Sequence, residues 1–164
     1  MMTLNYKNRH EKMAMAIYNL MLALWVGGIS IYTFLVTPAI FKAFGRDSAS
    51  AIVDKLFPLY FPYILVVVCL AAVAFLLSGW KRSSRPKFIL VSLCIAVLIT
   101  LFVNFGLYPA ARKIKQEISS FETTPADSTA RKQFRALHGI SMILNLILLV
   151  DGTVLIVIGG SGKK

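Results

Sequence analysis

Four long apolar runs, separated by short charged segments, constrain this chain more than any other feature of its sequence. A transmembrane α-helix needs about 20 consecutive, predominantly apolar residues, and each run reaches that length. Such a segment must be helical because lipid offers the backbone no hydrogen-bond partner. The mean hydropathy of +0.72 and the hydrophobic share of 57% agree with this pattern. We therefore predict an all-α integral membrane protein, a bundle of four transmembrane helices.

The runs place the four helices near residues 13 to 41, 59 to 78, 88 to 108 and 135 to 158. Between the first two, residues 46 to 57 are amphipathic, and we predict a short interfacial helix along the membrane surface. The first run is longer than a bilayer is thick, so Pro38 is expected to kink or end that helix. We find no internal repeat and treat residues 1 to 164 as a single four-helix transmembrane domain.

The net charge of +11 has a simple origin in such a protein. The 18 Lys and Arg residues lie at the ends of the apolar runs, where anionic headgroups attract them. No basic face with interleaved aromatic residues lies outside the runs, so we expect no nucleic-acid partner. The expected partner is the lipid bilayer, with a homo-oligomer or a larger membrane complex as an open alternative.

The predicted orientation depends on where these cations lie. Nine lie in the N-terminal segment, the hairpin at 80 to 87 and the C-terminal tail, and nine lie in the two remaining connectors. The hairpin packs four cations into eight residues, whereas six of the opposing cations are spread over a segment that can fold as an amphipathic helix. We predict a multi-pass protein of a cell membrane, in bacteria the inner membrane, with both termini in the cytoplasm.

Polar side chains within the spans are the best pointer to function, because they are costly at membrane depth and tend to face the bundle interior. On the fourth helix, His138, Ser141 and Asn145 fall at i, i+3 and i+7 and share one face. Asn104 of the third helix comes level with Ser141 and Asn145, which makes a polar seam feasible. Two interpretations stay open: hydrogen bonds that fix helix register, or a functional site.

Asp151 is the only acidic residue within a predicted span. It points away from His138 on the same helix and comes level with Asn19 of the first helix. We therefore predict a polar atom of the first helix within hydrogen-bond reach of the Asp151 carboxyl group, directly or through one water molecule, with Tyr18 or Trp25 as further donors near Asn19. A functional acid and a structural, hydrogen-bonded acid are both open interpretations.

Three further features bear on chemistry. Gly27 and Gly28 are expected to mark close helix packing, with close approach of a ligand as the alternative. His138 is the one weak candidate metal ligand, and an interfacial or hydrogen-bonding role competes with metal or proton binding. The sequence shows no paired carboxylates and no nucleophile with a supporting base, so we assign no catalytic residue. We expect no cofactor, and we leave haem or copper open.

Three segments carry a resemblance that extends over most of the chain. They are residues 18 to 41 with Trp25, Gly27, Gly28 and Pro38, residues 104 to 114, and residues 134 to 152 with Leu137, His138, Gly139, Ser141 and Asn145. In this order they resemble the transmembrane protein 205-like family, whose bacterial members carry a domain of unknown function. The resemblance implies a four-helix membrane protein without an established biochemical activity.

The first helix is also distantly similar to the opening helix of copper-resistance D-type proteins and of haem-carrying membrane protoporphyrinogen oxidases. Those families place a histidine within or beside that helix, whereas this chain has Asn19 there. Its other histidine, His10, is predicted at the opposite membrane face from His138. One chain could not clamp one haem between them.

The favoured function is that of a non-enzymatic membrane protein with a structural, partner-binding or stress-tolerance role, as the resemblance suggests. The alternative is a transport component that uses the polar seam for protons or a small solute. A further alternative is a metal- or haem-binding membrane protein. The visible spectrum and metal content of the purified protein would separate the last from the others.

Overall fold

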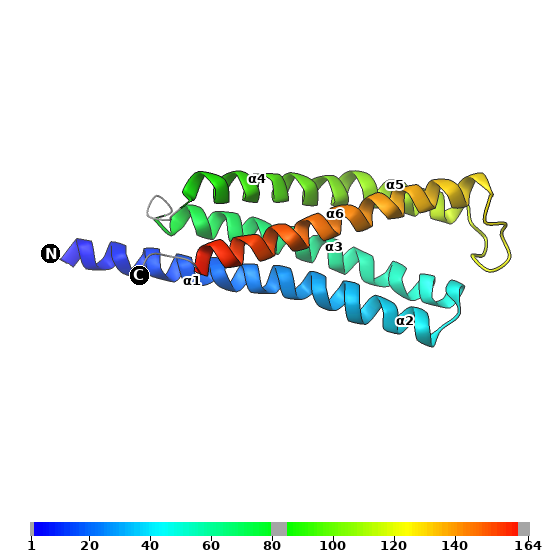
Figure 1. Ribbon diagram of the computed structural model, residues 1–164, viewed down its shortest axis with the longest axis horizontal. Helices are drawn as coiled ribbons and strands as arrows, with labels where there is room; N and C mark the ends of the chain where they lie inside the picture. The colour runs from blue at the N-terminus through cyan, green and yellow to red at the C-terminus, as the bar shows by residue number, and fades with distance from the viewer. Residues whose placement is uncertain (1, 80–84, 161–164) are drawn as a thin grey trace.

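Four long antiparallel helical segments make up the protein (Figure 1). The computed structural model describes residues 2–79 and 85–160. Four segments in this part are long and apolar enough to cross a membrane: Asn8–Ala43, Arg46–Leu77, Pro86–Gln116 and Thr129–Gly159. The predicted all-α, four-helix architecture of a multi-pass membrane protein is confirmed.

The helical segments are longer than a bilayer requires. They contain 31 to 36 residues, which at 1.5 Å per residue gives about 46 to 54 Å, against a hydrocarbon core of about 30 Å. The N-terminus of α1 and the C-terminus of α6 lie at one end of the bundle, which we call the terminal end (Figure 1). The connections at 44 to 45 and 117 to 128 lie at the other, the distal end, where the charged extensions of three spans gather.

The first span is interrupted by a wide turn just before its proline. It consists of α1 (Met2–Ile31), the π-helical turn η1 (Tyr32–Val36) and α2 (Thr37–Ala43). Pro38 has no N–H to donate to the carbonyl oxygen of Phe34. Instead, the Thr37 N–H donates to the Tyr32 carbonyl oxygen, five residues back. Pro38 therefore widens the helix without ending it.

The third span repeats this arrangement. It consists of α4 (Pro86–Phe102), the π-helical turn η3 (Val103–Leu107) and α5 (Tyr108–Gln116), and Pro109 follows the turn. Both turns lie in the pattern Phe-x-x-x-Pro-Ala, preceded by Thr33 or Asn104. Each such span is followed by a helix of 32 residues, α3 (Arg46–Leu77) or α6 (Thr129–Gly160). The chain thus uses one hairpin plan twice, a repetition that was not predicted because the shared pattern is short.

The predicted interfacial helix at 46 to 57 does not exist as a separate element. These residues form the first turns of α3, which continues without a break through Pro58 and Pro62. Their apolar face packs against protein, since Ala49 and Val53 are buried. The amphipathic pattern had suggested a membrane surface, but the partner of that face is the distal end of the bundle itself.

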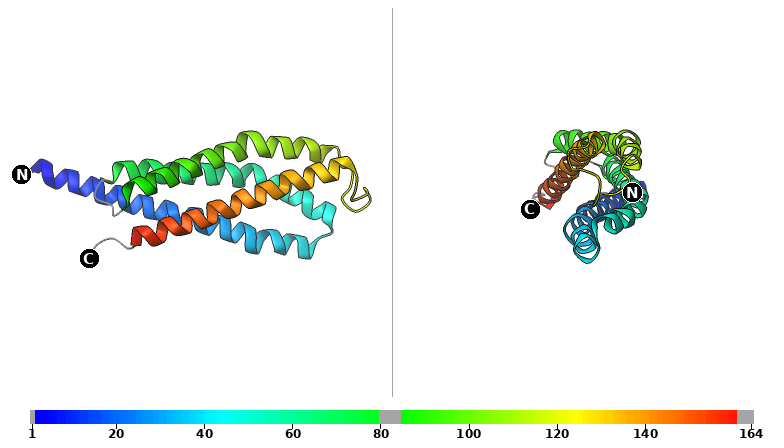
Figure 2. Two further views of the ribbon diagram at one scale, coloured as in Figure 1. Left: turned by 45° about the horizontal axis from the view of Figure 1, so that its top comes forward. Right: turned by 90° about the vertical axis from the view of Figure 1, so that its right-hand side faces the viewer.

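The path of α6 shapes the distal end. At the terminal end α6 packs against α1, where Tyr18, Trp25 and Ile29 are almost completely buried. Toward the distal end it crosses the bundle diagonally and packs against α5 (Figures 1 and 2). Among the described residues, α2 and α6 make no close backbone contact. The bundle is therefore closed at one end and open at the other.

Candidate functional site

A cavity of about 590 Å³ occupies the open end of the bundle, and we call it the distal chamber. Its walls come from η1 and α2, α3, η3 and α5, and α6. Nine of the lining residues are aromatic: Tyr32, Phe34, Phe41, Phe57, Tyr60, Phe61, Tyr108, Phe121 and Phe134. Small-molecule sites typically measure 300–1,000 Å³ and have apolar walls with a few placed polar groups. The distal chamber has the size and the walls of such a site.

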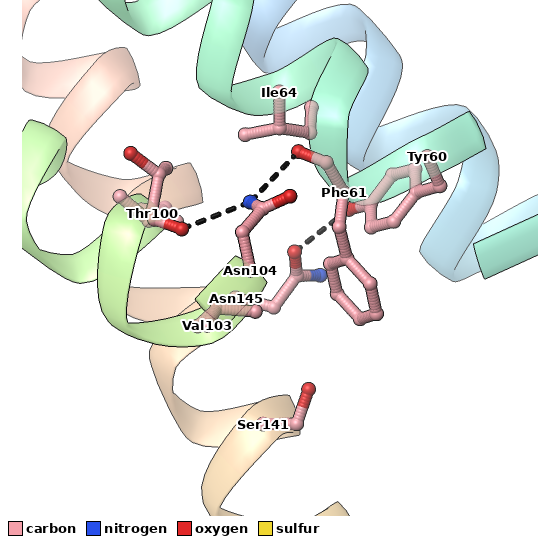
Figure 3. A pocket seen from close by; sticks show the side chains of 9 residues that line it. Tyr60, Phe61, Ile64, Thr100, Val103, Asn104, Ser141 and Asn145 are labelled. Carbon is pink, nitrogen blue, oxygen red and sulfur yellow. Dashed lines mark hydrogen bonds between the residues drawn. The ribbon is translucent and has the colours of Figure 1, made fainter. Parts of the chain in front are cut away.

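Asn145 joins three helical elements at the floor of the distal chamber. The Tyr60 hydroxyl of α3 donates to Asn145 Oδ1 over 2.7 Å (Figure 3). Asn145 Nδ2 donates in turn to Thr33 Oγ1 of η1 over 2.9 Å. The donor and the acceptor of this carboxamide are both satisfied by side chains from other helices. Asn145 is therefore held in one orientation.

Asn104 forms a second cross-helix link beside this floor (Figure 3). Its Nδ2 donates to the carbonyl oxygen of Phe61 in α3 over 3.1 Å and to that of Thr100 over 2.9 Å. Asn104, Asn145 and Ser141 line one small cavity that adjoins the distal chamber. In the described part of the chain, the Ser141 hydroxyl makes no hydrogen bond. The structure thus brings these three predicted site residues together.

His138 shares the distal chamber with Ser141 and Asn145, but, contrary to the prediction, it is not buried in the bundle interior. Its side chain is exposed, lines the wall of the distal chamber and stacks on Phe134, with ring centroids 5.9 Å apart. The reason is the path of α6, which diverges from α2 and leaves this side of the chamber open. His10 belongs to the terminal end of α1. In the described residues, no three His, Cys, Asp or Glu side chains gather as metal ligands.

The rim of the distal chamber is cationic. Lys115 forms an ion pair with Asp54 and donates to the Ser50 carbonyl oxygen over 3.0 Å. Arg46 and Arg112 also line the chamber. Neither arginine makes a hydrogen bond or ion pair within the described ranges. Both guanidinium groups at the mouth are therefore without a direct protein partner, although the Glu122 carboxylate lies beside Gly45, the neighbour of Arg46.

A clamp holds the connection between α5 and α6 next to this rim. Asp47, in the first turn of α3, accepts hydrogen bonds from Ser120 Oγ at 2.6 Å and from the Phe121 N–H at 2.5 Å. Arg131 donates to the carbonyl oxygens of Phe121 and Thr124. These bonds keep the Phe121 ring at the chamber wall.

Asp151 has a different partner from the one predicted. Its carboxyl group accepts a hydrogen bond from Ser92 of α4. Asn19 is exposed, because the buried stripe of α1 runs through Tyr18 and Trp25 and leaves Asn19 on its flank. Tyr18 lies near enough to interact electrostatically with Asp151, although its hydroxyl makes no hydrogen bond in the described chain. Of the side chains predicted near Asp151 on the first helix, Tyr18 lies close to the carboxyl group and Asn19 does not face it.

The polar seam is divided into two parts. Asp151 follows Asn145 by six positions on α6, about 9 Å along the helix, and Leu148 between them is buried. On α4, fully buried Ala96 lies between Ser92 and Thr100. An apolar layer thus separates the Asp151 site from the floor of the distal chamber.

Of the two adjacent glycines, one lies at a close helix contact. A Cβ atom on Gly28 would come within 2.6 Å of Tyr63 Cε1, and the Tyr63 hydroxyl donates to the Leu24 carbonyl oxygen over 2.9 Å. A Cβ atom on Gly27 would meet nothing within 4 Å. On α6, Gly152 plays a similar part, since a Cβ atom there would lie 2.9 Å from Val26 Cγ2 and 3.3 Å from the Trp25 ring of α1.

Comparison with known proteins gives this fold a family. Residues 20–120 match a family described as a domain of unknown function, DUF4149. The chain belongs to the DUF4149 family. An uncharacterized protein of Aquifex aeolicus (strain VF5) is 31% identical to it over 150 residues, which cover 90% of this chain and 96% of the relative. No solved structure matches the chain.

The part that matches DUF4149 contains several site residues that were not predicted. Thr33 and Tyr60 complete the floor with Asn145, and Arg46 and Arg112 form the rim. Thr33 could have been found, because it occupies the position of Asn104 in the repeated Phe-x-x-x-Pro-Ala pattern. The two arginines gave no such signal, since cations beside an apolar run are ordinary in any membrane protein.

Proposed function

We propose that this DUF4149 protein is a non-enzymatic membrane protein that binds an amphiphilic molecule in the distal chamber. The observation that carries the proposal is the chamber itself. About 590 Å³ of space lies between aromatic walls, above a hydrogen-bonded floor and below a cationic rim. A molecule with an apolar body and a polar head matches all three regions.

The floor favours binding over catalysis. The polar groups of Tyr60, Asn145 and Thr33 are bonded to one another, and Asn104 is bonded to backbone carbonyl oxygens. General acid–base or nucleophilic chemistry needs a titratable group held within reach of the reacting atom. The floor supplies neutral, mutually satisfied groups, which fix the shape of the chamber.

A chamber of this kind suits a partner-binding or stress-tolerance role, in which a membrane-soluble molecule is sequestered or presented. This is the kind of role suggested by the resemblance to the transmembrane protein 205-like family. We include the relationship to that family in the proposal. Of the three segments that resemble the family, 18 to 41 and 104 to 114 lie largely within the DUF4149 match at 20–120. Transport through a single bundle is less well supported, because buried Leu148 and Ala96 separate the two polar regions.

The proposal includes a location. Four cations in the eight residues from 80 to 87 favour a cytoplasmic terminal end. In a bacterial inner membrane the distal chamber would then open in the outer leaflet. No resident haem or copper forms part of the proposal, and a homo-oligomer is compatible with it.

The test uses stearic acid that carries a nitroxide spin label, together with its uncharged methyl ester. Electron paramagnetic resonance of purified protein in mild detergent measures the immobilised fraction of each. Ala111 lines the distal chamber, whereas Ala110 is exposed outside it. Ala111→Trp should therefore reduce binding of the immobilised amphiphile about tenfold, and Ala110→Trp should leave it unchanged.

Circular dichroism would establish that both tryptophan variants are folded. Immobilisation of at least one of the two amphiphiles by the wild type, lost only in Ala111→Trp, would support the proposal. Equal immobilisation by both folded variants, or none by the wild type, would overturn it.

A further inference from the structure

We infer that the distal chamber takes one acyl chain of an anionic phospholipid from the surrounding leaflet, with the phosphate group at Arg46 and Arg112. The inference rests on the proposed function and names the class of ligand. It depends on the depth of the chamber, on its charge and on its side opening.

The chamber extends from headgroup depth into the hydrocarbon. Between Lys55 and the end of α3 there is no charged residue, so the membrane boundary lies near Lys55. Arg46 lies above this boundary, and Tyr60 at the floor lies below it. Arg46 and Tyr60 are 14 positions apart, about 21 Å along the helix, and about 8 Å of this, from Lys55 to Tyr60, lies in the hydrocarbon. A lipid held in this leaflet would have its chain at the floor and its phosphate at the rim.

The charges of the rim select an anion. Asp54 neutralises Lys115, while Arg46 and Arg112 have no hydrogen-bond or ion-pair partner in the described chain. Arg46 is also the first residue of α3, where the helix dipole disfavours a cation. An anion between the arginines would offset both effects. Guanidinium groups bind phosphate oxygens in a bidentate manner, which makes a phosphodiester the fitting headgroup.

The chamber is open sideways to lipid. Phe34 and Met142 both line it, yet they are 56% and 54% exposed. They belong to η1 and α6, which flank the opening where α2 and α6 part. A chain from the bilayer can enter there while the second chain of the lipid stays outside.

The volume fits one acyl chain. If each methylene group fills about as much space as a water molecule in the liquid, roughly 30 Å³, a chain of about 16 methylene groups fills about 480 Å³. The chamber measures about 590 Å³. It is large enough to hold a single acyl chain.

The experiment is native mass spectrometry of the full-length protein in mild detergent. Equal amounts of dioleoyl phosphatidylglycerol, which is anionic, and dioleoyl phosphatidylcholine, which is zwitterionic, compete for the protein. The wild type should retain one phosphatidylglycerol with about tenfold preference. The pair Arg46→Gln and Arg112→Gln should reduce that preference to less than twofold.

A matched control removes the same charge from the same end. Lys55 and Lys113 are exposed and do not line the chamber, so the pair Lys55→Gln and Lys113→Gln should keep the preference. Loss of preference in both double variants would mean that overall charge selects the lipid, and the inference would fail. It would also fail if the protein retained no lipid but formed a dimer, because a second copy would then be the occupant.

The two proposals can be separated by their results. If the wild type retains both lipids equally and Ala111→Trp retains neither, the inference about the anionic headgroup fails and the proposed function stands. If Ala111→Trp retains as much lipid as the wild type and also immobilises the spin-labelled amphiphiles, both fail.

Discussion

Replacing Asn145 by leucine tests whether the floor of the distal chamber is held by hydrogen bonds. Leucine keeps much of the side-chain volume but removes the bonds to Tyr60 and Thr33. Hydrogen bonds between membrane helices average about 0.6 kcal/mol, so the two bonds together contribute about 1.2 kcal/mol. The Thr33 hydroxyl can turn to a carbonyl oxygen of its own helix. The Tyr60 hydroxyl also lies within reach of Thr33, so it keeps an alternative partner, and the expected loss of unfolding free energy stays at about 1 kcal/mol.

The measurement is equilibrium unfolding in mixed micelles, with a denaturing detergent as titrant and circular dichroism as readout. A double-mutant cycle with Tyr60→Phe isolates the bond between the two side chains, and its coupling energy should lie between about 0.6 and 1.7 kcal/mol. Ser141→Ala is the matched control, because Ser141 lies one turn away on α6 and its hydroxyl makes no hydrogen bond in the described ranges. It should change stability by less than about 0.5 kcal/mol.

Two results would refute this reasoning. If Asn145→Leu is neutral or stabilising, apolar packing alone holds α6 in place. If the effects of Asn145→Leu and Tyr60→Phe simply add, the two side chains do not interact in the folded protein. Either result would remove the argument that the floor is preformed.

Three further variants probe packing and the Asp151 site by the same unfolding measurement. Gly28→Ala should destabilise the protein by about 1 to 3 kcal/mol, because the added methyl group meets a phenol ring; Gly27→Ala, with open space around it, should not. Gly152→Ala should also be destabilising, since the added methyl group would come within 2.9 Å of Val26 Cγ2 and 3.3 Å of the Trp25 ring; no loss would argue against the pairing of α1 with α6. Ser92→Ala should cost about 1 to 3 kcal/mol, because it leaves the Asp151 carboxyl group without its hydrogen-bond donor; an unchanged stability would contradict the proposed pair.

The architecture could be predicted because a membrane requires every spanning segment to be apolar, and apolar segments can be recognised in the sequence one by one. Each span must be helical and apolar over its own length, whatever the other spans do. The boundaries of α3 could not be predicted in the same way. Residues 46 to 57 are amphipathic whether their apolar face meets lipid headgroups or protein, and the burial of Ala49 and Val53 depends on segments far away in the sequence.

The candidate site was predictable only where polar side chains lie deep in apolar runs. Asn104 and Asn145 were predicted because polar side chains are costly at membrane depth, and both form hydrogen bonds with other helices. The partner of Asp151 was predicted on the wrong helix. The depth of a residue can be counted along the sequence, but the sequence does not show which helix faces that residue. The distal chamber was not predictable at all, since it exists only because α6 crosses the bundle diagonally.

The repeated hairpin plan explains why the chamber can combine a fixed floor with an adaptable mouth. At the start of each π-helical region, a polar residue contacts the 32-residue helix of the other hairpin: Thr33 meets Asn145 of α6, and Asn104 meets the Phe61 carbonyl oxygen of α3. These two crossed links tie the hairpins together at one depth. Beyond these links, α2 and α5 extend from Pro38 and Pro109 to the distal end. Among the described elements, α2 packs only against α3 and the π-helical turn η1 that precedes it. A rigid floor would set how deep an apolar chain can reach, while a less constrained wall could move to admit it from the side.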